Sequence, residues 1–243
     1  MQVLLLDIEG TTTSISFVYD VLFPYARGIL EAALEDEGLL AARWTEPAYA
    51  SAIATMMGSS PDSASEAARF ALDLMDRDVK DTGLKLLQGL LWEGGYSDGT
   101  LRGHLFPDVA PALARAHAQG IRIAIYSSGS VAAQRLIFGF SVAGDLTPLI
   151  EAYFDTTTGP KRVASSYVAI AEALGVEAAA ITFCTDHPDE ARAALDAGCA
   201  VRVAVRPGNA ALPEGHTFTT FTSLDEVLAS LPRAERHLLS EMM

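Results

Sequence analysis

The amino-acid sequence predicts an α/β protein, a doubly wound (Rossmann-like) parallel sheet core with an inserted α-helical cap. Two observations lead to this prediction. Short apolar runs typical of buried strands occur at the start of the chain and again after Pro107, where they alternate with helical segments. Between these regions, residues 16–103 show no strand-like alternation. We therefore expect a core domain from residues 1–15 and 104–243 and a helical cap domain from residues 16–103.

The first predicted strand, residues 3–6, is an unbroken apolar run that ends in two carboxylates, Asp7 and Glu9. Ligands of open α/β sheets bind beyond the carboxyl ends of the strands. Side chains alternate along an extended chain, so these two carboxylates point the same way, and Gly10 then allows a turn. Converging carboxylates suit Mg²⁺, although a plain polar turn at a strand end is the other interpretation.

The block from 16 to 103 reads as a series of helices because apolar residues recur at spacings of three and four. Turn signals at Pro61 and Gly94 separate or end these helices. The expected helical segments are residues 17–25, 29–40, 65–79 and 81–92. We interpret this block as a lid over the strand ends.

After Pro107 the chain alternates between helix and strand, which predicts a parallel sheet. The expected helices are residues 111–119, 131–138, 163–174 and 188–197. The expected strands are residues 121–126, 153–154, 180–184 and 200–205.

Polar groups follow four of these strands, and together they match the needs of phosphoryl transfer. Asp7 can attack phosphorus as a nucleophile. Ser127 and the backbone N–H groups after it form an anion site at a helix N-terminus. Lys161 supplies positive charge, and Asp186 supplies a second carboxylate for a metal.

Each of these groups also has an ordinary structural explanation when it is taken alone. Ser127 and Ser128 can cap the helix that follows them. Lys161 can be a solvated surface lysine. Asp186 and Glu190 can be turn and first-turn carboxylates that the helix dipole favours. Their common position at strand ends, in this order, favours the phosphoryl-transfer interpretation.

Composition excludes several classes of partner. Lys plus Arg number 17 against 31 Asp plus Glu, a formal net charge of −14, which repels nucleic acid. Two cysteines are too few for a disulfide scaffold, and the first residues lack the basic region of a signal peptide. We expect a cytoplasmic monomer that binds a small phosphorylated molecule, with no nucleic-acid or membrane partner.

The polar groups at the four strand ends form four motifs that resemble the signatures of the haloacid dehalogenase superfamily. The motifs are residues 7–11, the strand that ends in Ser127, Lys161, and Thr185-Asp186 with Glu190. More narrowly, the chain is similar to the enolase-phosphatases (acireductone synthases) of methionine salvage from Leu4 to about Asn209. The segments that carry this likeness are LLDIEGTTTSISFV, DVLFPYAR, LQGLLWEGGY, YSSGSVAAQRLIFG, GDLTPL, YFDTTTGPK, SSY and VRPGNA. Glu9 makes the likeness specific, because the wider superfamily usually has aspartate there and this family shares the glutamate.

The resemblance implies a Mg²⁺-dependent enzyme that enolises 2,3-diketo-5-methylthiopentyl-1-phosphate and then dephosphorylates it to the acireductone through an aspartyl-phosphate. The metal ligands that it implies are Asp7, Glu9 and Asp186. The catalytic residues are Asp7, Glu9 and Lys161, and the substrate-binding residues are Ser127, Ser128 and Lys161.

Phe140 and Glu93 stand where relatives commonly have other residues, and both positions lie outside the four motifs. The base for enolisation is Glu9 or a residue of the cap, and spacing does not choose between them. The alternatives are another Mg²⁺-dependent phosphatase of the superfamily, a dehalogenase, or a phospho-aspartate signalling module.

Overall fold

The computed structural model describes residues 2–36 and 38–231, and their contacts divide the chain into two units. The sheet unit comprises the described parts of residues 1–12, 106–126 and 148–243. The helical unit comprises the described parts of residues 13–105 and 127–147, so it includes a segment that follows the second strand. The domain boundaries after residues 15 and 103 stay a prediction.

The sheet unit is built on six strands that all pair in parallel, in the order β3-β2-β1-β4-β5-β6. The strands are β1 (Val3–Leu6), β2 (Arg122–Tyr126), β3 (Ala152–Phe154), β4 (Ile181–Thr185), β5 (Ala200–Ala204) and β6 (Thr220–Phe221). The central strand β1 pairs with β2 on one side and β4 on the other, so the strand order reverses beside it. This topology confirms the predicted doubly wound sheet and places its ligand-binding edge at the end of β1.

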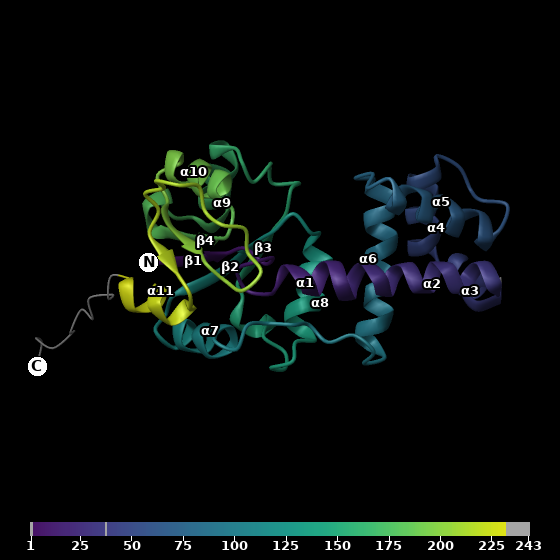
Figure 1. The fold of residues 1–243 in the computed structure, drawn as a ribbon, viewed down its shortest axis with the longest axis horizontal. Helices are drawn as coiled ribbons and strands as arrows, with labels where there is room; N and C mark the ends of the chain where they lie inside the picture. The colour runs from purple at the N-terminus through teal and green to yellow at the C-terminus, as the bar shows by residue number, and fades with distance from the viewer. Residues whose placement is uncertain (1, 37, 232–243) are drawn as a thin grey trace, which may run out of the picture. The chain divides into compact units, whose positions relative to one another are not determined.

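Helices cover both faces of this sheet (Figure 1). On one face lie α9 (Ala164–Leu174) and α10 (Pro188–Asp196), and on the other lie α7 (Val109–Ala118) and α11 (Leu224–Ser230). Short 3₁₀ turns, η2 (Thr147–Leu149) and η3 (Ala178–Ala180), precede β3 and β4. The alternation of strand and helix along the chain therefore becomes a three-layer arrangement within this unit.

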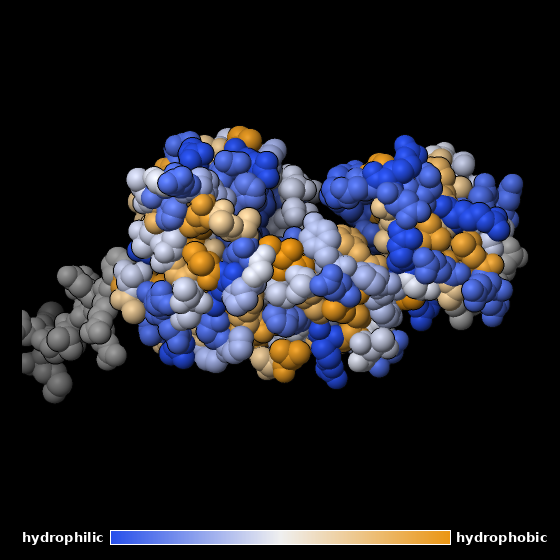
Figure 2. Space-filling model, in the orientation of Figure 1, coloured by the Kyte–Doolittle hydropathy of each residue, from blue (hydrophilic) through white to orange (hydrophobic). Residues whose placement is uncertain are grey.

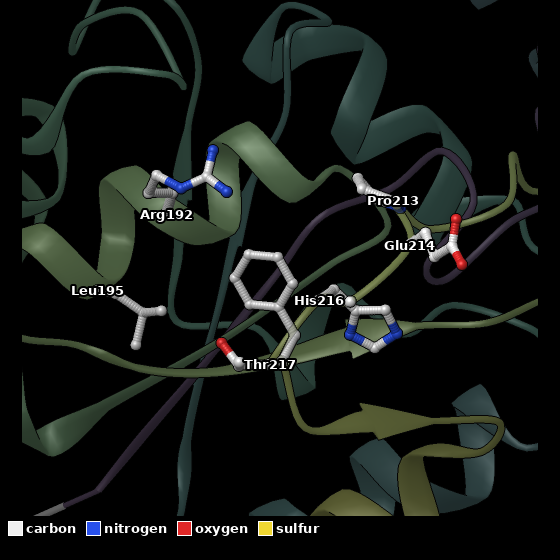
Figure 3. A pocket seen from close by; sticks show the side chains of 8 residues that line it. Arg192, Leu195, Pro213, Glu214, His216 and Thr217 are labelled. Carbon is white, nitrogen blue, oxygen red and sulfur yellow. The ribbon is translucent and has the colours of Figure 1, made fainter.

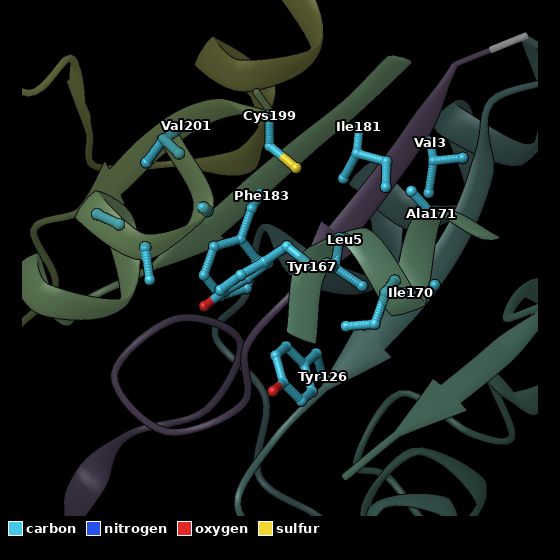
Figure 4. Close-up of a cluster of buried hydrophobic side chains, with 14 of the residues drawn as sticks. Val3, Leu5, Tyr126, Tyr167, Ile170, Ala171, Ile181, Phe183, Cys199 and Val201 are labelled. Carbon is cyan, nitrogen blue, oxygen red and sulfur yellow. The ribbon is translucent and has the colours of Figure 1, made fainter. Parts of the chain in front are cut away.

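The core under α9 and α10 is aromatic at its centre (Figure 4). Tyr126 on β2, Phe183 on β4 and Tyr167 on α9 lie with ring centroids 5.1 to 6.4 Å apart. All three are fully buried, and Leu5 of β1 belongs to the same cluster. Large rigid side chains at this position fix the spacing of the strands whose ends carry the polar residues.

The helical unit contains α1 (Ile15–Phe17), the π-helical turn η1 (Val18–Leu22), α2 (Phe23–Glu35), α3 (Gly38–Trp44), α4 (Pro47–Met57), α5 (Ala64–Asp76), α6 (Thr82–Ser97) and α8 (Val131–Gly139). Side chains in the sequence start several of these helices: Ser14, Ser63 and Asp81 each accept a hydrogen bond from a backbone N–H of the first turn. Small residues then allow close packing. Gly83 on α6 sits so close to α4 that a Cβ there would clash with the backbone of Met56.

On the face shown in Figure 2, hydrophilic side chains cover much of the surface of α4 and α5, with smaller apolar areas between them. No helix among the described residues is both long and apolar enough to cross a bilayer.

Candidate active site

Asp7 is held rigidly at the carboxyl end of β1. Its backbone N–H donates to the carbonyl of Cys184 on β4 at 2.9 Å, which extends the sheet by one residue. The residue is 5% exposed, and its Oδ1 accepts a hydrogen bond from the N–H of Ile8 at 2.7 Å. Gly10 then turns the chain with a φ of +66°, a conformation that L side chains rarely adopt. The buried carboxylate and the turn thus follow from the sequence DIEG.

Lys161 bridges two buried carboxylates. Its Nζ lies 2.6 Å from Asp7 Oδ1 and 2.7 Å from Glu190 Oε2, and the residue is only 8% exposed. The Nζ lies 5.8 Å from the ring centroid of Tyr126. The hydroxyl of Tyr167 donates to the Lys161 carbonyl at 2.6 Å, which fixes the backbone below the ammonium. Lys161 is therefore a structured element of the site rather than a solvated lysine.

Thr185 connects the end of β4 to the same cluster. Its hydroxyl lies 2.8 Å from Glu190 Oε2 and 3.3 Å from Asp7 Oδ2, and it accepts a hydrogen bond from the N–H of His187. A hydroxyl has one hydrogen to donate, and the shorter contact to Glu190 is the stronger one. Asp7 Oδ2 is therefore less tightly bound than Asp7 Oδ1, which both Lys161 and a backbone N–H hold.

The electrostatics of this cluster leave an excess of negative charge. Burial raises the pKa of Asp7 to about 7; the Lys161 ammonium opposes this rise, and the carboxylates of Glu190 and Asp186 add to it. Burial lowers the pKa of Lys161, but Asp7 and Glu190 together outweigh it, so the pKa of Lys161 is raised and the ammonium stays charged. Three carboxylates around one ammonium favour a bound cation.

Asp186 follows β4 and lies against the turn after Asp7. Its Oδ2 occupies the space beside Gly10, where a Cβ would clash with it. Burial, and then the charge of Glu190, raise the pKa of Asp186 above its ordinary value. Asp7 and Asp186 thus present carboxylate oxygens near the same turn. Mg²⁺ commonly takes one or two protein carboxylates and keeps several waters, so this donor set fits the ion.

Not every predicted ligand and contact is placed in this way. Glu9 is half-buried, and its roles as ligand and catalyst stay a prediction. Among the described residues, no group of three or more His, Cys, Asp or Glu side chains is gathered closely enough to hold a metal ion. A site on Asp7 and Asp186 would therefore depend on other oxygen donors to complete it.

The two predicted substrate serines follow β2, within the helical unit. Ser127 is buried and its hydroxyl accepts a hydrogen bond from the N–H of Gly129 at 3.3 Å, whereas Ser128 is exposed. The N-cap of α8 is Ser130, whose hydroxyl accepts from the N–H of Ala133. Helix capping is therefore not the role of Ser127 or Ser128, and their contact with substrate stays a prediction.

Sequence reasoning assigned no role to the segment after β5, yet this segment holds the turn that follows Asp7. Arg206 Nε donates to the carbonyl of Thr11 at 3.2 Å, and Asn209 Nδ2 donates to the carbonyl of Gly10 at 2.9 Å. The Arg206 guanidinium also forms a bidentate pair with Asp108, at 2.9 and 2.8 Å. The signal was present as the motif VRPGNA, but nothing in its spacing indicated which loop it contacts.

A shallow pocket of about 300 Å³ lies elsewhere in the sheet unit (Figure 3). It is formed between α10 and the segment that precedes β6, and residues lining it include Arg192, Leu195, Glu214 and His216. None of the predicted site residues lines this pocket, so we assign it no role in phosphoryl transfer.

Comparison with known sequences places this geometry in a family. The model of the haloacid dehalogenase-like hydrolases matches residues 1–198, and these hydrolases generally use a divalent metal ion. The chain is 50% identical over 220 residues to "Enolase-phosphatase E1" of Drosophila grimshawi, covering 88% of this chain and 90% of that protein. It is 48% identical over 238 residues to "Enolase-phosphatase E1" of Synechococcus elongatus, covering 92% and 96%.

Solved structures agree with this placement. The crystal structure of the UTR4 protein of Saccharomyces cerevisiae superposes with a TM-score of 0.77 at 34% identity, over 91% of this chain and 97% of that one. A phosphatase of the same superfamily from Thermococcus onnurineus superposes with a TM-score of 0.62 at 17% identity, over 96% and 100% of the two chains, and supports the fold alone. The chain therefore belongs to the enolase-phosphatase family of haloacid dehalogenase-like hydrolases.

Proposed function

We propose that this protein converts 2,3-diketo-5-methylthiopentyl-1-phosphate into the acireductone 1,2-dihydroxy-3-keto-5-methylthiopentene and phosphate. The observation that carries the proposal is the buried Asp7 at the end of β1, paired with Lys161 and belonging to a chain with the family's motifs. High identity over nearly the whole chain to proteins named for both steps supports the pairing of enolisation with dephosphorylation.

The dephosphorylation begins at Asp7. Its Oδ2 attacks the phosphorus, a bond forms between Oδ2 and phosphorus, and the bond between phosphorus and the substrate's ester oxygen breaks. The departing oxygen takes a proton from the solvent, and the water that attacks in the next step returns one to the solvent. Water then attacks the phosphorus of the aspartyl-phosphate, the bond to Oδ2 breaks, and phosphate leaves while Asp7 is regenerated.

Lys161 orients the nucleophile for this attack. Its ammonium holds Asp7 Oδ1 at 2.6 Å and is itself held by Glu190, so the attacking oxygen is presented without rotation of the carboxylate. The same charge favours the ionised form of Asp7 and stabilises negative charge on the transferring phosphoryl group. Glu190 is thus a positioning residue that acts through Lys161.

We propose Mg²⁺ as the divalent ion, held by the carboxylates of Asp7 and Asp186, with an oxygen of Glu9 among the further donors that complete the site. When bound it would neutralise phosphate oxygens. Asp7 and Asp186 contribute oxygen donors of the type that Mg²⁺ prefers. Burial is the main cause of their raised pKa values, and the charge of neighbouring carboxylates adds to it. Ser127 and Ser128 are proposed to bind the substrate through their hydroxyls and neighbouring N–H groups.

The test separates the two steps of the reaction. Phosphate release is measured with the diketo phosphate in Mg²⁺, after chelation, and after Mg²⁺ is restored. Enolisation is followed independently as exchange of the substrate's carbon-bound hydrogen with deuterium from the solvent. We expect Asp7→Asn to lose phosphate release while it retains measurable exchange. Hydrolysis of simple phosphate esters without turnover of the diketo phosphate would instead support a general phosphatase.

The predicted cytoplasmic location and monomeric state stay predictions. Sedimentation of the purified chain at several concentrations measures the second directly.

A further inference from the structure

Asn209 lies where the turn after Asp7 meets Asp186. Its Nδ2 donates to two carbonyls, that of Gly10 at 2.9 Å and that of Ala204 at 3.2 Å. Only an amide nitrogen can donate in this way, so the hydrogen-bond network settles which side-chain atom is oxygen. The Oδ1 is consequently fixed on the opposite side of the amide and cannot exchange places with the nitrogen.

That oxygen faces the position next to Gly10 that Asp186 also faces. A Cβ at Gly10 would lie 2.8 Å from Asn209 Oδ1 and would clash with Asp186 Oδ2, so the two oxygens are neighbours across the glycine. Asn209 Oδ1 is buried and accepts no hydrogen bond from the described protein. A buried acceptor oxygen without a donor, next to a carboxylate, requires a group that supplies hydrogens or positive charge.

We propose that Asn209 is a positioning residue of the cation site, and that its Oδ1 accepts a hydrogen bond from a water that the cation keeps beside Asp186. Mg²⁺ dehydrates reluctantly and retains several waters, which bring the donors that this oxygen lacks. The Nδ2 end of the same amide holds the Gly10 carbonyl. One side chain thus couples the cation site to the turn that carries the nucleophile Asp7.

Gly10 is required for this arrangement for two separate reasons. Its φ of +66° favours glycine, and the absence of a side chain leaves the space in which Asp186 and Asn209 present their oxygens. The inference depends on the proposed cation site and adds to it a residue that belongs neither to the carboxylates nor to the motifs of the nucleophile and the lysine.

The test measures binding of Mg²⁺ alone to the full chain by titration calorimetry, without substrate. Asn209→Leu is similar in size but removes both the oxygen and the nitrogen, and we expect the Kd for Mg²⁺ to rise roughly tenfold or more. Asn209→Asp loses the same nitrogen but keeps an acceptor beside Asp186 and adds a negative charge. We expect its Kd to be equal to or lower than that of the wild-type chain.

A purely structural role would give a different pattern, because both variants lose the hydrogen bonds to Gly10 and Ala204. Val203→Ala, which deletes buried apolar atoms from β5, is the control for general destabilisation and should leave the Mg²⁺ affinity unchanged. Unchanged affinity in Asn209→Leu, or equal weakening in both Asn209 variants, overturns the inference. If Asn209→Leu does not fold, Asn209→Ser replaces it with the same expected loss of affinity. Failure of the wild-type chain to bind Mg²⁺ would instead overturn the proposed ion.

Discussion

The two units of this protein bury polar groups in different ways. Of the described residues, the buried charged ones are Asp7, Lys161, Glu190 and Arg206, and all four belong to the sheet unit. The buried polar residues of the helical unit are uncharged: Thr13, Ser65, Gln88, Ser127, Gln134 and Ser141. Its main core cluster consists largely of alanine and leucine, with aromatic residues and methionine.

This difference indicates that the charged residues proposed for the reaction belong to the sheet unit, whereas the helical unit depends on packing. A buried charge is costly unless partners surround it, and a fold tolerates that cost where the charge performs a reaction. The sheet unit concentrates its buried charges next to the carboxyl ends of its strands, whereas the helical unit depends on close contact of small side chains. We therefore expect substitutions in the first unit to change the reaction most, and substitutions in the second to change stability most.

The largest effect is expected from Asp7→Asn. The amide keeps the size of the side chain but cannot attack phosphorus, so kcat for phosphate release should fall by roughly 10⁴-fold or more. The melting temperature should hold or rise, because burial and the neighbouring carboxylates make the ionised Asp7 costly. A variant that kept a tenth of the wild-type activity would remove Asp7 from the role of nucleophile.

The next effect is expected from Lys161→Met, which retains most of the stem and removes the charge. We expect kcat/KM to fall by roughly 100-fold or more. The free energy of unfolding should fall by about 3 kcal/mol in the absence of metal, because Asp7 and Glu190 lose their shared partner. Lys161→Arg is the matched control for charge alone and should not restore activity, because a planar guanidinium does not fit the place of an ammonium.

In the helical unit, Gly83→Ala should reduce stability rather than chemistry. The added methyl would lie 2.6 Å from the carbonyl oxygen of Ala52 and would clash with the N–H of Met56, so α4 must move. We expect a loss of about 1–3 kcal/mol in urea unfolding. Gly89→Ala on the same helix is the control: nothing lies within 4 Å of its Cβ position, and better helix propensity should add about 0.5–1 kcal/mol. Equal effects of the two substitutions would contradict close packing at Gly83.

The smallest expected effect is on how the stability of the fold depends on pH, and it arises at Asp108. Burial raises the pKa of Asp108, but hydrogen bonds from Arg206 and from the N–H of Leu224 outweigh it, and the net pKa is lowered below 3.8. A lowered carboxyl pKa stabilises the fold above the unfolded pKa, and this contribution is lost as pH falls through the folded pKa.

The stability difference between the wild-type chain and Asp108→Asn should therefore be constant from about pH 5 to 7 and shrink below about pH 4. Urea unfolding across this range measures it. Glu226→Gln serves as a control at an exposed carboxylate that accepts hydrogen bonds from Thr222. A difference that grew on acidification would contradict the lowered pKa of Asp108.

The class of fold, and candidate residues for the reaction, could be predicted from the sequence alone. Apolar runs ending in polar groups predicted parallel strands with a site at their carboxyl ends, and Asp7, Lys161 and Asp186 were identified from those ends. These features could be predicted from the chain because they depend on neighbours within a few residues: unbroken apolar runs, helical spacing of apolar residues and glycine turns.

Which of these groups lie together could not be predicted from the sequence. Lys161 pairs with Glu190 as well as with Asp7, and Asn209 reaches the carbonyl of Gly10 across a separation of 199 residues. The reason is physical: pairing β1 with both β2 and β4 brings loops that are distant in sequence to one edge of the sheet, and contacts of that kind leave no local periodicity in the chain.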